Sequence, residues 1–378
     1  MPGGHAYRVP SGIPHNLGKF GDETVLVLEL LKYAAGGSRS SPGSGPVSLL
    51  EGASDREVRW ALDGGLGPML HRACRECGDP VPERWRAPLL SADLTARVRH
   101  GNIVDAACEV IDLCRARSVP VTLLKGISVS DQYYPEPHLR PMADIDLLVP
   151  ADAQETVESD LLARGYLPLQ NHGRDENPRH GVPLCHPGLQ VWIEVHTTLF
   201  DGPAPRDVFS SGHVAAETAP ATFHARPVNR LTDELQLLYL ATSWIADLSR
   251  YGVKIHPSCL PALFDAVYLL KGRTKPLRED ALVGPGDSEM AVASLYVMLA
   301  LLARCGLDLC DAALISRLGA GQALVGPLQL HVIHAVLERF LLGGRPWNLP
   351  FPLPVPGRYS VRHQLRKRLT AGRPGVGL

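Results

Sequence analysis

The spacing of apolar residues changes twice along the chain, and this change limits the possible folds more than any other feature. Up to about residue 117, apolar residues recur every three or four positions, as on one face of a helix. From residue 118 to 230 the apolar stretches are short, rich in β-branched residues and separated by Gly or Pro, as in strands. The helical spacing returns between residues 231 and 345. The sequence therefore predicts an α+β fold, with a small mixed β-sheet core flanked by N- and C-terminal helical regions.

These changes divide the 378 residues into four predicted segments. The segments are an N-terminal helical region (1–117) with a flexible Gly/Ser-rich linker near 36–46, an α/β core (118–230), a C-terminal helical domain (231–345) and a Pro-rich, basic tail (346–378). A chain of this length is too long for one ordinary hydrophobic core, which agrees with a division into domains.

Two aspartates, Asp144 and Asp146, lie within the apolar segment "DIDLLVP", which predicts a buried strand. Because side chains alternate along a strand, both carboxylates point to one face, whereas Ile145 and Leu147 point to the other. Two neighbouring carboxylates repel each other unless a cation lies between them. Oxygen-rich sites of this kind suit Mg²⁺ or Mn²⁺.

A third carboxylate, Glu194, lies in the strand-like segment "VWIEVHTTL". If this strand neighbours the first, Glu194 joins Asp144 and Asp146, and three such carboxylates can hold two divalent metal ions. His196 lies on the same face and can hold a metal-binding carboxylate through a hydrogen bond, although a structural role for it is an equal alternative.

The segment "LLKGIS" predicts a strand that ends at Gly126 and leads into a short helix. A glycine permits close approach of the backbone, and the free N–H groups at a helix start attract phosphate. Lys125 and Arg140 can add positive charge, and Ser128 can add a hydroxyl group. The alternatives are a solvated Lys125 and an Arg140 that only forms a salt bridge with Asp144 or Asp146.

These motifs resemble the nucleotidyltransferases of the DNA polymerase β-like superfamily. The more specific resemblance is to a group of uncharacterised bacterial nucleotidyltransferases, through "LLKG" at 123–126, Arg140, "DIDLLV" at 144–149 and "EVH" at 194–196. The likeness covers roughly residues 20–340, and its motifs lie within 123–199. The chain departs from the superfamily pattern at Gly126-Ile127-Ser128, where paired small residues are usual, and at Thr197, where this group often has Trp.

The resemblance implies an enzyme that binds an NTP with Mg²⁺ or Mn²⁺, transfers the NMP to an acceptor and releases pyrophosphate. In that scheme Asp144, Asp146 and Glu194 bind the metal ions, Glu194 takes the acceptor's proton, and Lys125, Gly126, Ser128 and Arg140 contact the nucleotide. Two alternatives remain, namely a degraded nucleotidyltransferase fold used as a binding module and a kinase-like phosphotransferase.

Composition bears on the partners and the location of the protein. The formal net charge is -1, so no strong overall field attracts nucleic acid or an anionic membrane, and the expected acceptor is a small molecule, peptide or protein. The longest apolar run, at 291–303, is too short to span a bilayer. No signal peptide is expected, and eight scattered cysteines then indicate reduced thiols and a cytoplasmic location.

Overall fold

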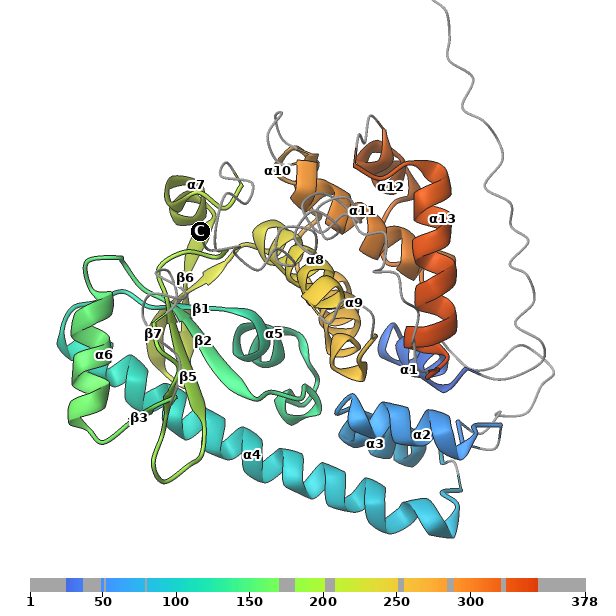
Figure 1. Ribbon diagram of the computed structural model, residues 1–378, viewed down its shortest axis with the longest axis horizontal. Coiled ribbons are helices and arrows are strands. Elements are labelled where there is room, and N and C mark those ends of the chain that lie inside the picture. Colours follow the sequence, from blue (N-terminus) through green and yellow to red (C-terminus); the bar gives the residue numbers. More distant parts are fainter. Residues whose placement is uncertain are drawn as a thin grey trace, which may run out of the picture.

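The computed structural model describes residues 25–36, 49–50, 52–78, 80–169, 181–200, 208–250, 255–283, 289–320 and 324–345. The predicted linker near 36–46, apart from its first residue, and the predicted basic tail at 346–378 lie outside these residues. The described part of the chain forms a mixed sheet, and helical segments precede and follow the strands along the sequence (Figure 1). This arrangement confirms the predicted α+β fold class.

Helices make up both flanks and also connect the strands. The α-helices are α1 (Leu26–Ala34), α2 (Asp55–Asp63), α3 (Gly67–Cys77), α4 (Glu83–Ala116), α5 (Lys125–Tyr133), α6 (Gln154–Ala163), α7 (Ser211–Ala216), α8 (Asp233–Arg250), α9 (Pro261–Gly272), α10 (Glu279–Val283), α11 (Glu289–Arg304), α12 (Ala312–Gly319) and α13 (Pro327–Val336). Short 3₁₀ turns, η1 (Pro137–Leu139) and η2 (Pro257–Cys259), and a π-helical turn, η3 (Leu337–Leu342), complete them.

Within the described residues, seven strands form one sheet in the order β3-β4-β5-β2-β1-β7-β6. They are β1 (Thr122–Leu123), β2 (Asp144–Leu148), β3 (Leu167–Pro168), β4 (Leu184–Cys185), β5 (Trp192–His196), β6 (Thr218–Phe223) and β7 (Arg226–Leu231). The central pair, β2 and β5, is parallel, and β1 pairs antiparallel with β2 and parallel with β7. The sheet is therefore mixed, as the sequence predicted.

The long helix α4 belongs to both hydrophobic cores. Its C-terminal half packs with α6 on the apolar face of the sheet, where Ile145, Leu147 and Ile193 are fully buried. Its N-terminal half joins the second core, which unites α1–α3 with the C-terminal helices. Figure 1 shows α4 passing from beneath α2 and α3 to the sheet. The domain boundary predicted at residue 117 stays a prediction.

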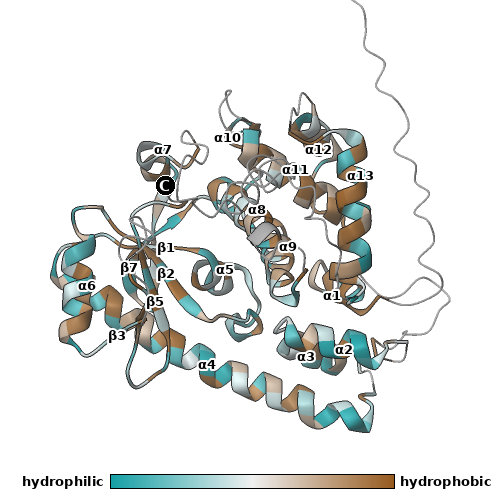
Figure 2. Ribbon diagram, viewed as in Figure 1, coloured by the Kyte–Doolittle hydropathy of each residue, from teal (hydrophilic) through white to brown (hydrophobic). Residues whose placement is uncertain are grey.

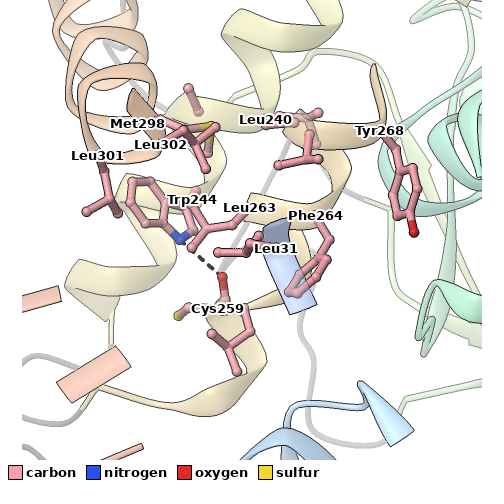
Figure 3. Packing of buried hydrophobic residues seen from close by; sticks show 14 of the residues in the cluster. Leu31, Leu240, Trp244, Cys259, Leu263, Phe264, Tyr268, Met298, Leu301 and Leu302 are labelled. Atoms are coloured by element: carbon pink, nitrogen blue, oxygen red, sulfur yellow. Dashed lines mark hydrogen bonds between the residues drawn. The ribbon is translucent and has the colours of Figure 1, made fainter. Parts of the chain in front are cut away.

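Hydrophobic residues occupy the positions that these two cores require. Figure 2 shows brown, hydrophobic stretches on the central strands and mixed brown and teal residues along α4. In the second core, the Trp244 indole of α8 is 1% exposed and donates to the Cys259 carbonyl at 3.1 Å. Leu263, Met298 and Leu301 surround it (Figure 3). Burial of each such side chain stabilises the fold by about 1.5–3 kcal/mol, and the indole N–H is satisfied.

One local prediction was wrong, and one element was missed. The first strand ends at Leu123, not at Gly126, because Lys125 has a left-handed φ of 43° that turns the chain directly into α5. Sequence analysis did not predict the β6–β7 hairpin. Its two turn residues, His224 and Ala225, have φ values of 46° and 63°, which is the conformation that Asn-Gly usually provides in such turns.

No helix in the ranges given above is long and apolar enough to cross a membrane.

Candidate active site

The register of the central strands places Asp146 beside Glu194. Strands β2 and β5 run parallel, and these two residues are direct Cα partners. Asp144 precedes Asp146 by two positions on the same strand, so all three carboxylates lie on one face of the sheet. Ile145 and Leu147, which alternate with the aspartates on β2, are fully buried on the opposite face. Their burial fixes which side chains of β2 face the carboxylate side.

Asp146 is held by two donors that meet at one of its oxygens. The Lys125 ammonium donates to Oδ1 at 3.0 Å, and Nε2 of His196 donates to the same atom at 2.7 Å. Asp146 is 4% exposed and His196 is 0% exposed. Burial alone would raise the pKa of Asp146, but Lys125 and His196 outweigh it and hold the pKa well below its usual range. Asp146 is therefore ionised.

The pKa of Asp144 is shifted in the opposite direction from that of Asp146. Burial raises its pKa from 3.8 to about 6, and the negative charges of Asp146 and Glu194 act in the same direction. Lys125 and Arg140 lower the pKa but do not compensate. Without a metal ion, the ionised form of Asp144 therefore destabilises the folded protein. A divalent cation near the three carboxylates would remove that destabilisation.

One group of side chains near these strands has the spacing of a metal site. Single ligand atoms of Asp146, Glu194 and His196 all lie within 4.8 Å of one another. His196 Nε2 is 3.7 Å from Glu194 Oε2, and the Glu194 side chain is 29% exposed, so one side of the group faces solvent. Carboxylate oxygens dominate the donors, which fits Mg²⁺ or Mn²⁺. The group contains Asp146 and Glu194 of the three predicted ligands but not Asp144, and its two carboxylates fit the expected metal.

Comparison with protein families agrees with this geometry. A family described as an uncharacterised nucleotidyltransferase matches residues 53–259, which is more than half of the chain and includes β2 and β5. The chain belongs to this nucleotidyltransferase family. Membership confirms both the family and the enzyme class that the motifs predicted. A search among curated proteins gave no match.

Lys125 links the carboxylates of this nucleotidyltransferase to the C-terminal helices. Its ammonium lies 5.8 Å from the ring centroid of Tyr239 on α8, within the range of a cation–π contact. Burial would lower the pKa of Lys125, but Asp146 outweighs this effect and raises it, so Lys125 stays charged. The left-handed φ at Lys125 is unusual for a residue with a side chain and directs the chain straight into α5. Nothing in the sequence pointed to Tyr239.

Gly126 has a packing role that the sequence did not reveal. A Cβ atom at this position would lie 3.0 Å from Cγ of Met142 and 3.1 Å from Nη1 of Arg140. Both contacts are tighter than ordinary van der Waals distances, so the absence of a side chain lets α5 approach the segment before β2. Whether the backbone at Gly126 also contacts phosphate stays a prediction.

Ser128 is buried, with 1% of its surface exposed. Its hydroxyl oxygen accepts a hydrogen bond from Gln132 Nε2 at 3.1 Å, and its carbonyl accepts one from Arg230 at 2.9 Å. The bond from Arg230 fixes α5 against β7, and the bond from Gln132 lies within α5. The predicted contact between Ser128 and phosphate stays a prediction.

Arg140 forms its salt bridge with Asp265 on α9. The guanidinium donates to Oδ2 of Asp265 at 2.8 Å through Nη2, and Tyr134 donates to Oδ1 at 2.8 Å. Asp265 is 0% exposed. Burial would lower the pKa of Arg140, but Asp265 outweighs it and raises it, so the pair is ionic. Sequence analysis had missed Asp265, although a single acid within the apolar helix "LPALFDAVYLL" is a sign of a buried partner.

Proposed function

We propose that this nucleotidyltransferase transfers an NMP from an NTP to a hydroxyl or another acceptor group, with release of pyrophosphate in a metal-dependent reaction. The observation that carries the proposal is the pairing of Asp146 with Glu194 beside an Asp144 whose pKa is raised to about 6. The nearby cationic side chains do not neutralise all three carboxylates, and such a site favours a divalent metal ion.

Each residue of the site has a distinct proposed role. Asp144, Asp146 and Glu194 would hold Mg²⁺ or Mn²⁺, and His196 and Lys125 keep Asp146 in its ionised orientation. When bound, a pair of such ions supplies charge that activates an attacking oxygen and stabilises the leaving pyrophosphate. The Glu194 side chain is 29% exposed whereas that of Asp146 is 5% exposed, so we assign Glu194 to take the acceptor's proton.

Lys125, Gly126, Ser128 and Arg140 remain the proposed contacts for the nucleotide. Lys125 is the strongest of these, because its ammonium already lies at the carboxylates and its side chain is 33% exposed. Arg140 would act mainly through Asp265, by fixing the segment that leads into β2. The acceptor is proposed to be a small molecule, a peptide or a protein, since the net charge of -1 gives no field for a long nucleic acid.

A labelling experiment distinguishes this reaction from phosphoryl transfer. Purified protein is incubated with Mg²⁺, a cell extract as the source of acceptor, and either α-labelled or γ-labelled NTP. Nucleotidyl transfer moves the α-label to an acceptor and forms pyrophosphate, whereas a kinase moves the γ-label and forms a nucleoside diphosphate. Transfer of the γ-label alone contradicts the proposal.

Glu194→Gln provides the test of the catalytic role. The substitution should lower nucleotidyl transfer by about 10²–10³, the scale expected when one charged group is removed from a preorganised site. Glu109→Gln is a matched control, because Glu109 lies on α4, away from the carboxylate face, and has a similar exposure of 34%. Its activity should equal that of the wild type. Equal activity of Glu194→Gln and the wild type would contradict the role given to Glu194.

A further inference from the structure

A cavity of about 420 Å³ lies at the end of the sheet where β2 stops. Its lining comes from the start of β1, the end of β2, the segment after β5, the α7 region and the β6–β7 hairpin. Thr122, Leu148, Phe209, Ser211 and Asn229 are among the lining residues. The volume is in the range of pockets that hold small organic ligands. Figure 1 shows α7 beyond this end of the sheet, next to β6.

The strand register puts this cavity on the same face as the carboxylates. Leu148 pairs with Thr122, and Thr122 pairs with Asn229, so these three side chains lie side by side on one face. Leu148 follows Asp146 by two positions on β2 and therefore shares its face. Two residues of a strand span about 7 Å, so the cavity begins about that far from Asp146 along β2.

The lining is mostly apolar and carries no charged side chain, but it includes hydroxyl groups and one side-chain amide, from Thr122, Thr197, Thr198, Ser211, Thr218 and Asn229. Thr122 is 7% exposed, and within the described parts of the chain neither its hydroxyl nor the Asn229 side-chain amide has a hydrogen-bond partner. Both groups therefore face the cavity with free hydrogen-bonding capacity, because a hydroxyl can donate and accept and an amide offers two donors and an acceptor. This end of the sheet is therefore suited to an uncharged ligand that has several hydrogen-bonding groups.

A second cavity, of about 250 Å³, has a different character. It is lined by α3, α4 and the loop before β2, and its side chains include Arg99, His100 and Arg140. This cavity carries two arginines and two histidines, and Arg140 is already paired with the buried Asp265. It is therefore a weaker candidate for the neutral part of a substrate that reacts at Asp146.

We infer that the uncharged cavity binds the nucleoside of the NTP, that is, its base and sugar. An NTP joins a highly charged triphosphate to an uncharged nucleoside, and it therefore needs a charged site with an uncharged pocket beside it that offers apolar surface and hydrogen-bonding groups. The carboxylates with their metal ions and Lys125 supply the first, and Thr122 and Asn229 supply the second. This inference rests on the proposed function, because only an NTP substrate would divide between the two sites in this way.

The test compares ligands that do and do not contain a nucleoside. Calorimetric titrations with Mg²⁺ use ATP, GTP, CTP and UTP in turn, and inorganic tripolyphosphate as the ligand without base or sugar. Thr122→Val and Asn229→Ala each remove hydrogen-bonding groups from the cavity. Each should weaken binding of the preferred NTP about three- to tenfold, the effect of one net hydrogen bond, and leave the affinity for tripolyphosphate unchanged.

Two further variants control for damage to the fold. Thr122→Ser keeps the hydroxyl and should retain the wild-type affinity for the NTP. Asn102→Ala is matched to Asn229→Ala, because Asn102 is also half-buried but lies on α4 and donates to the Leu189 carbonyl at 3.3 Å. It should bind both ligands as the wild type does.

Three other outcomes would overturn the inference, and each has a distinct meaning. If Thr122→Val and Asn229→Ala bind the NTP as tightly as the wild type, the cavity does not hold the nucleoside. If NTP and tripolyphosphate weaken together, the substitutions act on the charged site and the cavity is not a separate pocket. If the wild type binds neither ligand in the presence of Mg²⁺, the proposed function itself fails, and the inference fails with it.

Discussion

Replacing Asp144 by Asn should stabilise the metal-free protein at neutral pH. Burial raises the pKa of Asp144 from 3.8 to about 6, and Asp146 and Glu194 add to the effect. The folded state therefore binds a proton at Asp144 more tightly than the unfolded state does. Ionisation of this carboxyl opposes folding, and an uncharged amide of the same shape avoids that cost.

The magnitude and the sign follow from this difference in pKa. Each unit is worth about 1.4 kcal/mol, so ionised Asp144 lowers the free energy of unfolding by about 3 kcal/mol. The cost is absent below 3.8, where Asp144 is protonated in both states, grows as the pH rises, and is complete above about 6. Asp144→Asn should therefore match the wild type at low pH and exceed it by up to about 3 kcal/mol above the folded-state pKa.

Urea unfolding in the presence of EDTA measures this effect. The free energies of unfolding of the wild type and Asp144→Asn are compared at about pH 4 and about pH 8, so that groups common to both proteins cancel. Asp112→Asn serves as a control of opposite sign, because Arg226 lowers the pKa of Asp112 and the substitution should destabilise the protein above that pKa. If Asp144→Asn is less stable than the wild type at about pH 8, Asp144 is a satisfied structural carboxylate and the reasoning is wrong.

Two other predictions concern the salt bridge to α9 and the binding of metal with nucleotide. Asp265→Ala should lower the free energy of unfolding by about 3–5 kcal/mol, because it leaves the buried charge of Arg140 unpaired, and the double variant Asp265→Leu/Arg140→Met should recover much of the loss in urea unfolding. Equal stability of Asp265→Ala and the wild type would refute the importance of this bridge. In thermal unfolding, an NTP with Mg²⁺ at about 100 times its Kd should stabilise the wild type by about 2.7 kcal/mol, and Asp146→Asn should lose most of that gain. A gain that is the same without Mg²⁺ would argue against metal-dependent binding.

Local sequence patterns were sufficient to predict the parts of the site that lie on single strands. The alternation of Asp144, Asp146 and Glu194 with buried apolar residues fixes the face of each carboxylate, and the structure agrees at each position. Such patterns are reliable because a strand buried on one face tolerates no shift of one residue. The hairpin at β6–β7 escaped prediction because His224 and Ala225 adopt the turn without the glycine that usually signals it.

The remaining features of the site depend on contacts between residues that are far apart in the sequence. Asp146 lies beside Glu194 only because β2 and β5 pair in parallel, and no local pattern sets that register. In the same way, Lys125 contacts Asp146 from a residue with an unusual backbone angle. Arg140 forms its salt bridge with Asp265, which lies 125 positions further along the chain. The sequence by itself determined which side chains could carry the chemistry. Only the tertiary structure decided which of them meet, because strand pairing and helix packing are set by burial over the whole molecule.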